Sequence, residues 1–286
     1  MNAINVNTKL VGLLGNPLGH SFSPAMQNRA FEKLGLDYYY LPIEVAGENL
    51  GDVVKGISRM NFAGFNVTIP HKINIIKYLD EIDELAEIIG AVNTVTIKDG
   101  RLKGYNTDGS GFVRSLEEET GITVQDQNVF ILGSGGASRS IALTVAYKGA
   151  RTICLCNRTV SKAQELAGEI NAKVRECCIS VTLDKGEMKE LLKDCDIFIN
   201  TTSVGMHPKD EEIPLDPELI NEKTIVCDII YNPLKTKLLK ETGKKGCKTV
   251  NGLGMLLFQG AEAFKLWTGK DAPVSDMEVI LHVLSR

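Results

Sequence analysis

The sequence of 286 residues has no apolar run approaching the roughly 20 residues that a membrane-spanning helix needs. Its start, MNAINVNTKLVGLLG, has no basic segment followed by an apolar stretch and a cleavage site, as a secretory signal would have. It has no excess of positive charge either, because 32 Lys and Arg residues stand against 36 Asp and Glu residues, for a net charge of -4. We therefore expect a cytoplasmic chain whose partner is neither a membrane nor a nucleic acid.

The sequence also lacks the spacings that mark metal sites and disulfide frameworks. Its seven cysteines are odd in number and include no C-x-x-C pair, and its four histidines are scattered without metal-ligand spacing. In a cytosolic chain such cysteines are typically small buried hydrophobes, and Cys154 and Cys156 fall on one face of an expected strand. We expect no bound metal.

What the sequence does contain is the composition of a globular protein, with 43% hydrophobic and 24% charged residues. Its length suggests two domains, although a single domain is compatible with it. Ser23 is the expected N-cap of the first helix, with Pro24 at the first helical position. Apolar periodicity in the first hundred residues predicts strands at 10–14, 38–42 and 64–69, helices at 24–34, 50–60 and 73–89, and a hairpin-like pair of strands at 92–98 and 102–105.

The second part of the chain is expected to contain buried strands that alternate with helices. NVFIL, TICLC, DIFIN and TIVCD are typical of such strands, and the alternation predicts a doubly wound parallel sheet. After NGLG we expect an apolar helix and then a last helix near Ser275, with a capping box between Ser275 and Glu278. If these helices return to the first part, residues 1–108 and 252–286 form one discontinuous domain and residues 109–251 form the other.

A glycine-rich turn, GSGGAS, lies between an expected strand and an expected helix. This is the context that a dinucleotide-binding fingerprint requires. Gly133 would permit the tight turn, and Gly135 would let the backbone approach a pyrophosphate at the helix N-terminus. Ser138 takes the place of the third glycine, so the helix must pack on the strand with a small side chain there. The alternative is a glycine turn that binds no ligand.

The end of the next strand indicates which dinucleotide would bind. An NAD site requires an acidic residue about 20 residues further on, where it binds the ribose 2′-hydroxyl. Asn157 takes that place and Arg158 follows, and an arginine can pair with a 2′-phosphate and stack on the adenine. Lys162 would add charge one helical turn later, although it lacks the planar fork of arginine. NADP is favoured over NAD; the alternative is that Arg158 and Lys162 are solvated residues at a helix start.

The stretch GFNVTIPHK delivers Lys72 to a point where a strand ends and a helix is expected to begin. The helix dipole repels a positive charge there, so the position needs a reason. Asp108, in GYNTDGSGF, also follows a strand and precedes a helix. A Lys–Asp pair beside a nicotinamide could move the proton that accompanies a hydride. Each residue also has a structural explanation, Lys72 as a solvated side chain and Asp108 as a helix cap.

Further polar groups lie at strand ends and helix starts. Ser21 and Ser23, together with the free N–H groups of a helix start, would suit a carboxylate. Taken singly, such residues are more typical of caps and surfaces than of a site. The others of this kind are Asn66, Thr68, Asn93 and Gln259.

Together these stretches resemble the shikimate dehydrogenase family over nearly the whole chain. The resemblance rests on GNPLGHSFSPAMQN, GFNVTIPHK, GAVNT, GYNTDGSG, GSGGASRS, NRT, NTTSVGM, DIIYNP and GMLLFQGAEAFKLWTG, which occur in the order of the family. It implies an N-terminal α/β substrate domain, a Rossmann-like NADP domain, and C-terminal helices that return to the substrate domain. It also implies reversible NADPH-dependent reduction of 3-dehydroshikimate to shikimate, on the route to chorismate and the aromatic amino acids.

The resemblance implies roles for individual residues as well. Lys72 and Asp108 resemble the catalytic pair, with Lys72 taking the proton of the 3-hydroxyl in the shikimate-oxidising direction. Ser21 and Ser23 resemble carboxylate-binding serines. The residues that resemble the groups holding the ring hydroxyls are Thr68, Asn93, Asp108, Tyr231 and Gln259. Those that resemble the NADP contacts are Gly133, Gly135, Gly136, Ala137, Asn157, Arg158, Thr159, Lys162, Ile229 and Gly252.

Alternatives remain open at this point. The related quinate/shikimate dehydrogenases share the Lys–Asp pair, so dual use of shikimate and quinate, and of NAD and NADP, is compatible with the sequence. A non-catalytic NADP-sensing module on the same fold would be expected to have lost Lys72, Asp108 or the serines. A general hydroxy-acid dehydrogenase would need a catalytic His or Tyr with supporting groups, and no histidine here has them. The resemblance also leaves a homodimer open.

Overall fold

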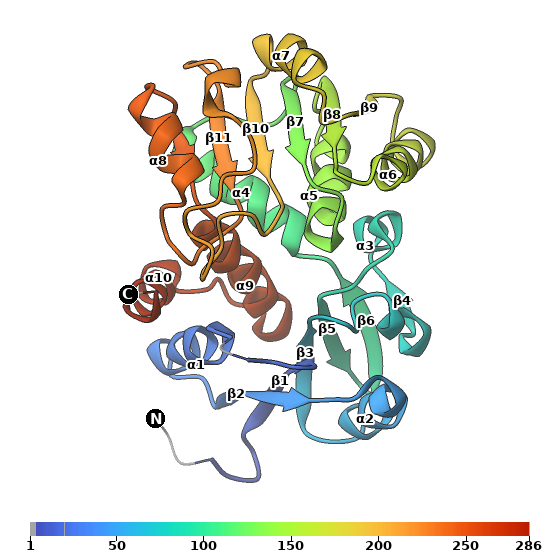
Figure 1. Ribbon diagram of the computed structural model, residues 1–286. Helices are drawn as coiled ribbons and strands as arrows, with labels where there is room; N and C mark the ends of the chain where they lie inside the picture. The colour runs from blue at the N-terminus through green and yellow to red at the C-terminus, as the bar shows by residue number, and fades with distance from the viewer. Residues whose placement is uncertain (1–3, 20, 286) are drawn as a thin grey trace. The chain divides into compact units, whose positions relative to one another are not determined.

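The computed structural model describes residues 4–19 and 21–285 and divides into two compact units. The first unit combines Met1–Thr107 with Leu257–Leu284, and the second contains Asp108–Leu256. The chain therefore passes from the second unit back to the first within the helix α9 (Gly252–Thr268). Each unit has its own six-stranded sheet with helices packed against it (Figure 1). The predicted fold class, with C-terminal helices that return to the first part of the chain, is confirmed.

The sheet of the first unit is mixed. Its strand order is β2-β1-β3-β5-β6-β4, in which β1 runs parallel to both β2 and β3, whereas β5 is antiparallel to β3 and to β6. Because β1, β2 and β3 are parallel, their carboxyl ends lie at one edge of the sheet. The strands are β1 (Lys9–Gly15), β2 (Tyr38–Glu44), β3 (Phe62–Val67), β4 (Glu81–Ile82), β5 (Thr94–Lys98) and β6 (Arg101–Tyr105).

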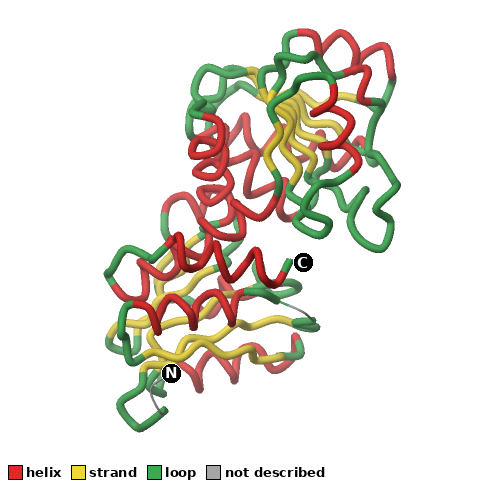
Figure 2. The backbone as a smooth tube through the Cα atoms, turned by 90° about the vertical axis from the view of Figure 1, so that its left-hand side faces the viewer, coloured by secondary structure: helices red, strands yellow, loops and turns green. Residues whose placement is uncertain are grey.

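Helices from both ends of the chain cover this sheet. α1 (Ser23–Lys33) and α10 (Val274–Leu284) lie side by side (Figures 1 and 2), and Arg29 pairs with Asp276 at 3.1 Å. The indole N–H of Trp267 in α9 donates to the Val95 carbonyl at 3.0 Å. Buried hydrogen bonds of this kind, together with apolar packing, attach the C-terminal segment to the first unit. The remaining helices of the unit are α2 (Leu50–Ile57), α3 (Glu84–Ile89) and the 3-10 helices η1 (Gly47–Asn49) and η2 (Asn74–Tyr78).

The sheet of the second unit is entirely parallel. Its strand order is β12-β11-β10-β7-β8-β9, the order of a dinucleotide-binding doubly wound sheet, in which the direction of winding changes between β7 and β10. The strands are buried on both faces and have the apolar runs that such strands require. They are β7 (Asn128–Leu132), β8 (Thr152–Cys156), β9 (Cys178–Val181), β10 (Ile197–Asn200), β11 (Ile225–Asp228) and β12 (Thr249–Val250).

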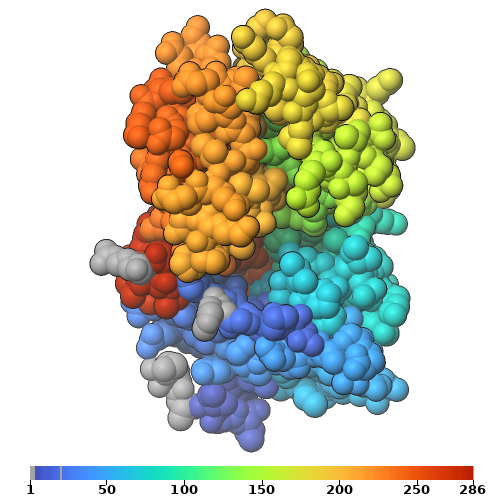
Figure 3. Space-filling model, viewed as in Figure 1, coloured from blue at the N-terminus to red at the C-terminus, as the bar shows by residue number. Residues whose placement is uncertain are grey.

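Four α-helices connect these strands, with a long irregular segment between β10 and β11. That segment and its neighbours form a broad part of the surface of the second unit in Figure 3, where they are orange. None of the helices within residues 4–19 and 21–285 combines the length and apolar character needed to cross a bilayer. The helix α4 (Asp108–Thr120) precedes β7, and the connecting helices are α5 (Gly136–Tyr147), α6 (Val160–Lys173), α7 (Lys185–Lys193) and α8 (Lys237–Lys244), with the 3-10 helix η3 (Pro217–Leu219).

The predicted helix at residues 73–89 is wrong. The chain there forms η2, the short strand β4 and α3. β4 pairs in parallel with β6, and Asp80, just before β4, is hydrogen-bonded to Leu102 of β6 through both its side chain and its backbone. The Oδ2 atom of Asp80 accepts from the Leu102 N–H at 2.7 Å, while the Asp80 N–H donates to the Leu102 carbonyl at 3.0 Å. Pairing with β6 therefore overrides the local helical period.

Two predicted helix caps are also wrong. Ser23 is the first residue of α1 rather than its N-cap, which is Phe22, and no side chain caps that helix. α10 begins at Val274, so Ser275 lies inside the helix and cannot form the predicted capping box with Glu278. At the start of α10 the carbonyl of Pro273 accepts from the N–H groups of Asp276 and Met277 instead. Ser23 is thus left available for another partner.

Gly64 makes a test of how tightly α9 packs on the first sheet. A Cβ atom at Gly64 would overlap the Val95 carbonyl oxygen and the Trp267 ring nitrogen, the two atoms that form the hydrogen bond above. We expect Gly64→Ala to lower the free energy of unfolding by about 1–3 kcal/mol. Urea unfolding followed by Trp267 fluorescence would measure it, since the chain has 1 Trp. Gly47→Ala, whose Cβ would meet nothing within 4 Å, is the control; equal losses in both variants would contradict the prediction.

Candidate active site

The carboxyl ends of β1 and β3 are tied together. The Thr68 N–H donates to the Leu14 carbonyl at 2.8 Å, and the Asn16 N–H donates to the Ile69 carbonyl at 3.1 Å. A Cβ atom at Gly15 would overlap the Thr68 methyl group, so glycine is needed for this close approach. The segment after β1, which leads to Ser21 and Ser23, is thereby held beside the segment after β3, which carries Thr68 and Lys72.

Lys72 lies in a turn after β3, ahead of η2, rather than in the first turn of a long helix. The turn is anchored by His71, which is buried, with Nε2 at 2.7 Å from the Val45 carbonyl oxygen. The His71 N–H donates to the Thr68 carbonyl at 2.8 Å, and the Lys72 carbonyl accepts from the Val92 N–H at 2.8 Å. The backbone of Lys72 is therefore fixed on both sides, while its side chain is half-buried.

Asn93 follows Val92 directly and is a buried centre of hydrogen bonds. Its Oδ1 accepts from the Thr107 N–H at 2.8 Å, and its Nδ2 donates to the Thr107 hydroxyl at 3.0 Å. Thr107 is the residue before Asp108, which is itself 8% exposed and begins α4. The predicted residues Lys72 and Asn93 are thus joined through Val92, and Asn93 holds the residue that precedes Asp108.

The two predicted carboxylate-binding serines lie at the start of α1. The Ser21 hydroxyl oxygen accepts from the Ser23 N–H at 3.3 Å, and both side chains are half-buried. The Ser23 N–H is thus taken, Pro24 has no N–H, and the Met26 N–H donates to the Phe22 carbonyl at 3.1 Å, so the serine hydroxyls are the main groups that this helix start could offer to an anion.

Gln259, which is half-buried, lies in α9 just before Gly260. The Gly260 carbonyl accepts from Gln27 Nε2 of α1 at 2.8 Å, and this bond fixes α9 against α1. This bond was not predicted from the sequence, in which Gln27 is simply a polar residue within an expected helix.

In the second unit the glycine turn connects β7 to α5. Gly133 has φ +114°, a conformation that favours glycine, and its N–H donates to the Cys156 carbonyl at the end of β8 at 2.7 Å. The buried Ser138 hydroxyl donates to the Gly133 carbonyl at 2.7 Å, so the serine in place of a third glycine closes the turn. Added Cβ atoms at Gly135 and Gly136 would meet nothing within 4 Å, and no side chain caps α5. Open space over free N–H groups fits a pyrophosphate.

The turn after β8 lies next to the glycine turn, because β7 and β8 are neighbours. Asn157 Nδ2 donates to the Thr159 carbonyl at 2.9 Å, and Thr159 is the N-cap position of α6 without a side-chain bond. Arg158 and Lys162 are exposed, and the first turn of α6 has no acidic residue. The site is therefore positive where a 2′-phosphate would lie, which fits NADP.

The other predicted cofactor and substrate residues of this unit follow β11. A Cβ atom at Gly252 would overlap the Ile229 carbonyl, and the Gly252 N–H donates to the Ile230 carbonyl at 3.0 Å, so Ile229 and Gly252 lie together. Tyr231 is half-buried, and burial raises its pKa. Tyr231 and Asp108 belong to the second unit, whereas the other predicted substrate residues belong to the first.

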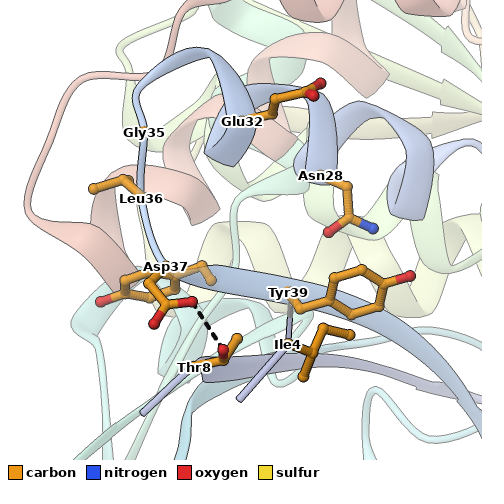
Figure 4. Close-up of a pocket in the computed structure, with 9 residues that line it drawn as sticks. Ile4, Thr8, Asn28, Glu32, Gly35, Leu36, Asp37 and Tyr39 are labelled. Carbon is orange, nitrogen blue, oxygen red and sulfur yellow. Dashed lines mark hydrogen bonds between the residues drawn. The ribbon is translucent and has the colours of Figure 1, made fainter. Parts of the chain in front are cut away.

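The pocket shown in Figure 4 lies elsewhere in the first unit, at the amino ends of β1 and β2. Its wall includes Thr8, whose hydroxyl donates to Asp37 at 2.8 Å, and Tyr39. None of the predicted site residues is among those that line it. In the described part of the chain, no three His, Cys, Asp or Glu side chains are grouped so that they could hold a metal ion.

Comparison with known proteins identifies the family of the chain. The family model for the shikimate dehydrogenase substrate binding domain matches residues 13–95, that for shikimate / quinate 5-dehydrogenase matches residues 115–212, and that for the shikimate 5'-dehydrogenase C-terminal domain matches residues 252–278. The shikimate dehydrogenase (NADP(+)) of Alkaliphilus metalliredigens is 49% identical over 276 residues, which cover 96% of each chain. The chain belongs to the shikimate dehydrogenase family.

Solved members of the family have the same fold. A crystal structure of shikimate dehydrogenase in complex with NADP+ superposes with a TM-score of 0.91 at 48% identity, and covers 98% of this chain and 97% of that one. The shikimate 5-dehydrogenase of Listeria monocytogenes, in complex with shikimate and NAD, gives a TM-score of 0.94 at 41% identity, with 98% and 99% covered. The family resemblance expected from the sequence is confirmed, while the roles of single residues remain predictions.

One residue beside the predicted site was missed in the sequence. Asp228, at the end of β11, is 1% exposed. Its Oδ1 accepts from Asn200 Nδ2 at 3.1 Å and from the Ile230 N–H at 3.2 Å, and its Oδ2 accepts from the Thr236 hydroxyl at 2.8 Å. It therefore joins the ends of β10 and β11 to the start of α8, directly before Ile229 and Tyr231. An acid within the apolar run TIVCDII was the available signal, since buried carboxylates need partners.

Burial raises the pKa of Asp228 to about 6. Because the native state then binds a proton more readily than the unfolded state, stability falls as the pH rises between about 4 and 6. As the pH rises through that window, the free energy of unfolding falls by about 3 kcal/mol, at 1.36 kcal/mol per unit of pKa.

We therefore predict that Asp228→Asn, which retains the shape of the side chain but cannot ionise, removes this cost. Urea unfolding of wild type and variant at pH 4 and pH 7 measures it. Wild type should lose stability relative to the variant by a few kcal/mol between the two pH values. A difference that stays constant with pH would show that Asp228 does not titrate in this window.

Proposed function

We propose that the chain catalyses the reversible NADPH-dependent reduction of 3-dehydroshikimate to shikimate. Near-full-length similarity to members of the shikimate dehydrogenase family supports it. The observation that carries it for this chain is the connection of Lys72 to Asn93. The Val92 N–H holds the Lys72 carbonyl at 2.8 Å, and Asn93 holds Thr107, the residue before Asp108. The predicted proton-transfer groups thus emerge from segments that the fold fixes.

Lys72 is the proposed proton-transfer group. In the shikimate-oxidising direction, the neutral amine of Lys72 takes the proton from the 3-hydroxyl as the hydrogen on C3 leaves with its electron pair, and a C=O bond forms at C3. In the reducing direction, the Lys72 ammonium returns that proton to the oxygen. Asp108 is proposed to bind a ring hydroxyl and to orient Lys72. NADP supplies the hydride acceptor or donor when it is bound.

The remaining predicted residues are proposed to bind and orient the substrate. Ser21 and Ser23 lie on the segment after β1 and Thr68 on the segment after β3, which hydrogen bonds join, and their hydroxyls suit the carboxylate of shikimate. Asn93, Tyr231 and Gln259 are proposed to hold ring hydroxyls. Such groups contribute to turnover by fixing C3 and its hydroxyl in a reactive geometry.

The cofactor is proposed to bind along the carboxyl ends of β7, β8 and β11. Gly133, Gly135, Gly136 and Ala137 would receive the pyrophosphate at the start of α5. Asn157, Arg158, Thr159 and Lys162 would hold the adenosine 2′-phosphate, and Ile229 with Gly252 the nicotinamide half. The open space over Gly135 and Gly136 and the exposed arginine support this assignment.

Quinate is the second candidate substrate. The family model that matches residues 115–212 is described as shikimate / quinate 5-dehydrogenase, which favours its inclusion. Quinate has an extra hydroxyl at C1 and lacks the ring double bond, and a pocket rejects an added hydroxyl only weakly.

Two wider assignments extend this proposal. The enzyme is expected to work in the cytoplasm, where its seven free cysteines would stay reduced. The second is that the chain forms a homodimer. Sedimentation at several protein concentrations would distinguish a homodimer from a monomer.

Replacing Lys72 tests the proposed function directly. We expect wild type to oxidise shikimate with NADP+ and Lys72→Ala to lose at least a hundredfold in kcat, because the proton acceptor is gone, with little change in KM for shikimate. Steady-state assays of NADPH formation measure both. Lys77→Ala, a lysine of η2, is the matched control. Wild type without shikimate turnover, or Lys72→Ala with the kcat of wild type, would contradict the proposal.

Replacing Arg158 tests the choice of cofactor. We expect Arg158→Ala to raise KM for NADP+ about tenfold or more, since a charge-assisted contact with the 2′-phosphate is lost, and to leave KM for NAD+ nearly unchanged. The control is Arg151→Ala, an exposed arginine at the opposite end of β8. Equal effects on the two cofactors would rule out a 2′-phosphate contact.

A further inference from the structure

A set of buried polar side chains runs through the first unit between two predicted substrate residues, Ser23 and Asn93. We call it the polar chain and define it as Tyr40, Asn66, Thr94 and Thr107. Their exposed fractions are 1%, 7%, 0% and 0%, in that order. They come from β2, β3, β5 and the segment after β6. Burying a polar side chain costs free energy unless it has a hydrogen-bond partner, so each member of the polar chain is expected to have one.

The first half of the polar chain begins at α1. The Ser23 hydroxyl lies near enough to the Tyr40 phenol to lower its pKa, although burial has the larger and opposite effect. The Tyr40 hydroxyl donates to Asn66 Oδ1 at 2.8 Å. Asn66 Nδ2 then donates to the Asn93 carbonyl at 3.0 Å and to the Thr94 hydroxyl at 2.9 Å. Burial raises the pKa of Tyr40, so its phenol keeps the proton that it donates at neutral pH.

The second half fixes the Asn93 side chain. Asn93 Oδ1 accepts from the Thr94 hydroxyl at 3.0 Å and from the Thr107 N–H at 2.8 Å, while Asn93 Nδ2 donates to the Thr107 hydroxyl at 3.0 Å. Of the two ends of the amide only the oxygen can accept from the Thr107 N–H, so the amide cannot turn over without breaking this contact. The orientation of the Asn93 side chain is therefore fixed by Thr94 and Thr107.

The polar chain links the two ends of the proposed substrate site. Ser23 is proposed to bind the carboxylate, whereas Asn93 is proposed to bind a ring hydroxyl. From Tyr40 to Thr107 every link is buried and no longer than 3.0 Å, and a satisfied buried network holds its members in one geometry. The distance between the two substrate contacts is then set by side chains that need not touch the substrate.

We propose that Tyr40, Asn66 and Thr107 are positioning residues, which hold Ser23 and Asn93 at the spacing of the carboxylate and ring hydroxyls of shikimate. This inference rests on the proposed function. It concerns binding and orientation of the substrate in the first unit and leaves the cofactor contacts of the second unit untouched. The measurable consequence is a change in the kinetic constants for shikimate alone.

Tyr40→Phe is the first test, because it removes the donor to Asn66 and keeps the packed ring. We expect KM for shikimate to rise about tenfold, as for loss of one buried hydrogen bond, with KM for NADP+ within twofold of wild type. Tyr39→Phe is the matched control. Tyr39 is the neighbour on β2, lies on the other face of the strand and lines the separate pocket in Figure 4. It should leave both KM values unchanged.

A pair of substitutions at Thr107 separates the hydroxyl from its volume. Thr107→Val keeps the shape but loses the acceptor for Asn93 Nδ2, and we expect kcat/KM for shikimate to fall about tenfold. Thr107→Ser retains the hydroxyl and should restore kcat/KM to within threefold of wild type. If only packing mattered, Thr107→Ser would be the more harmful variant, because it removes a buried methyl group.

A double variant at Ser23 and Tyr40 measures the coupling between these two neighbouring residues. Ser23→Ala with Tyr40→Phe should raise KM for shikimate by less than the product of the single effects, because both act through one contact. Unchanged shikimate constants in Tyr40→Phe and Thr107→Val, or equal rises in KM for shikimate and NADP+, would overturn the inference. Should Thr107→Val fail to fold, Tyr40→Phe decides alone. Wild type without shikimate turnover would instead overturn the proposed function.

Discussion

The hydrogen bond from the Thr107 N–H to Asn93 Oδ1, at 2.8 Å, is the contact on which the proposed substrate site most depends. Asn93 directly follows Val92, which holds the backbone of Lys72, and Thr107 directly precedes Asp108. Val92 and Asn93 thereby fix the segments that follow β3 and β6, the first through its backbone N–H and the second through its side chain. If the Asn93 side chain were lost, several buried polar groups would be left without partners, at a cost of about 1–3 kcal/mol each. The position of Lys72 is thus a property of the whole first sheet.

The proposed binding surfaces of the two units depend on different kinds of groups. In the first unit, polar side chains would bind the substrate, because a small hydroxylated acid needs hydrogen-bond donors and acceptors at fixed places. In the second unit, backbone N–H groups at a helix start would bind the pyrophosphate, and this requires that no side chain covers them. Gly135 and Gly136 leave that space open, and Ser138 closes the turn below it. Asp228 is the exception, a buried acid that holds the strand ends behind this surface.

Much of this could be predicted from the sequence because the signals were local. The alternation of apolar strands with helices, the glycine turn between β7 and α5, and the arginine after β8 each depend on residues close together in the chain. The helix expected at residues 73–89 failed because Asp80 and β4 pair with β6, a contact that the local period does not encode. The strand β9, with exposed Ile179 at the sheet edge, carried too weak an apolar pattern to be recognised. The polar chain was invisible for the same reason, since Tyr40, Asn66 and Thr107 meet only after folding.

The measurement that tests the account most directly is kcat/KM of the purified protein for shikimate and for quinate, each with NADP+ and with NAD+. We predict that shikimate with NADP+ is turned over best, because Arg158 is proposed to bind the 2′-phosphate and quinate carries an added hydroxyl at C1. Comparable turnover of quinate would show that the site does not discriminate against that hydroxyl and would support the dual-substrate alternative. Comparable turnover with NAD+ would contradict the role assigned to Arg158, and no turnover of either substrate would contradict the function itself.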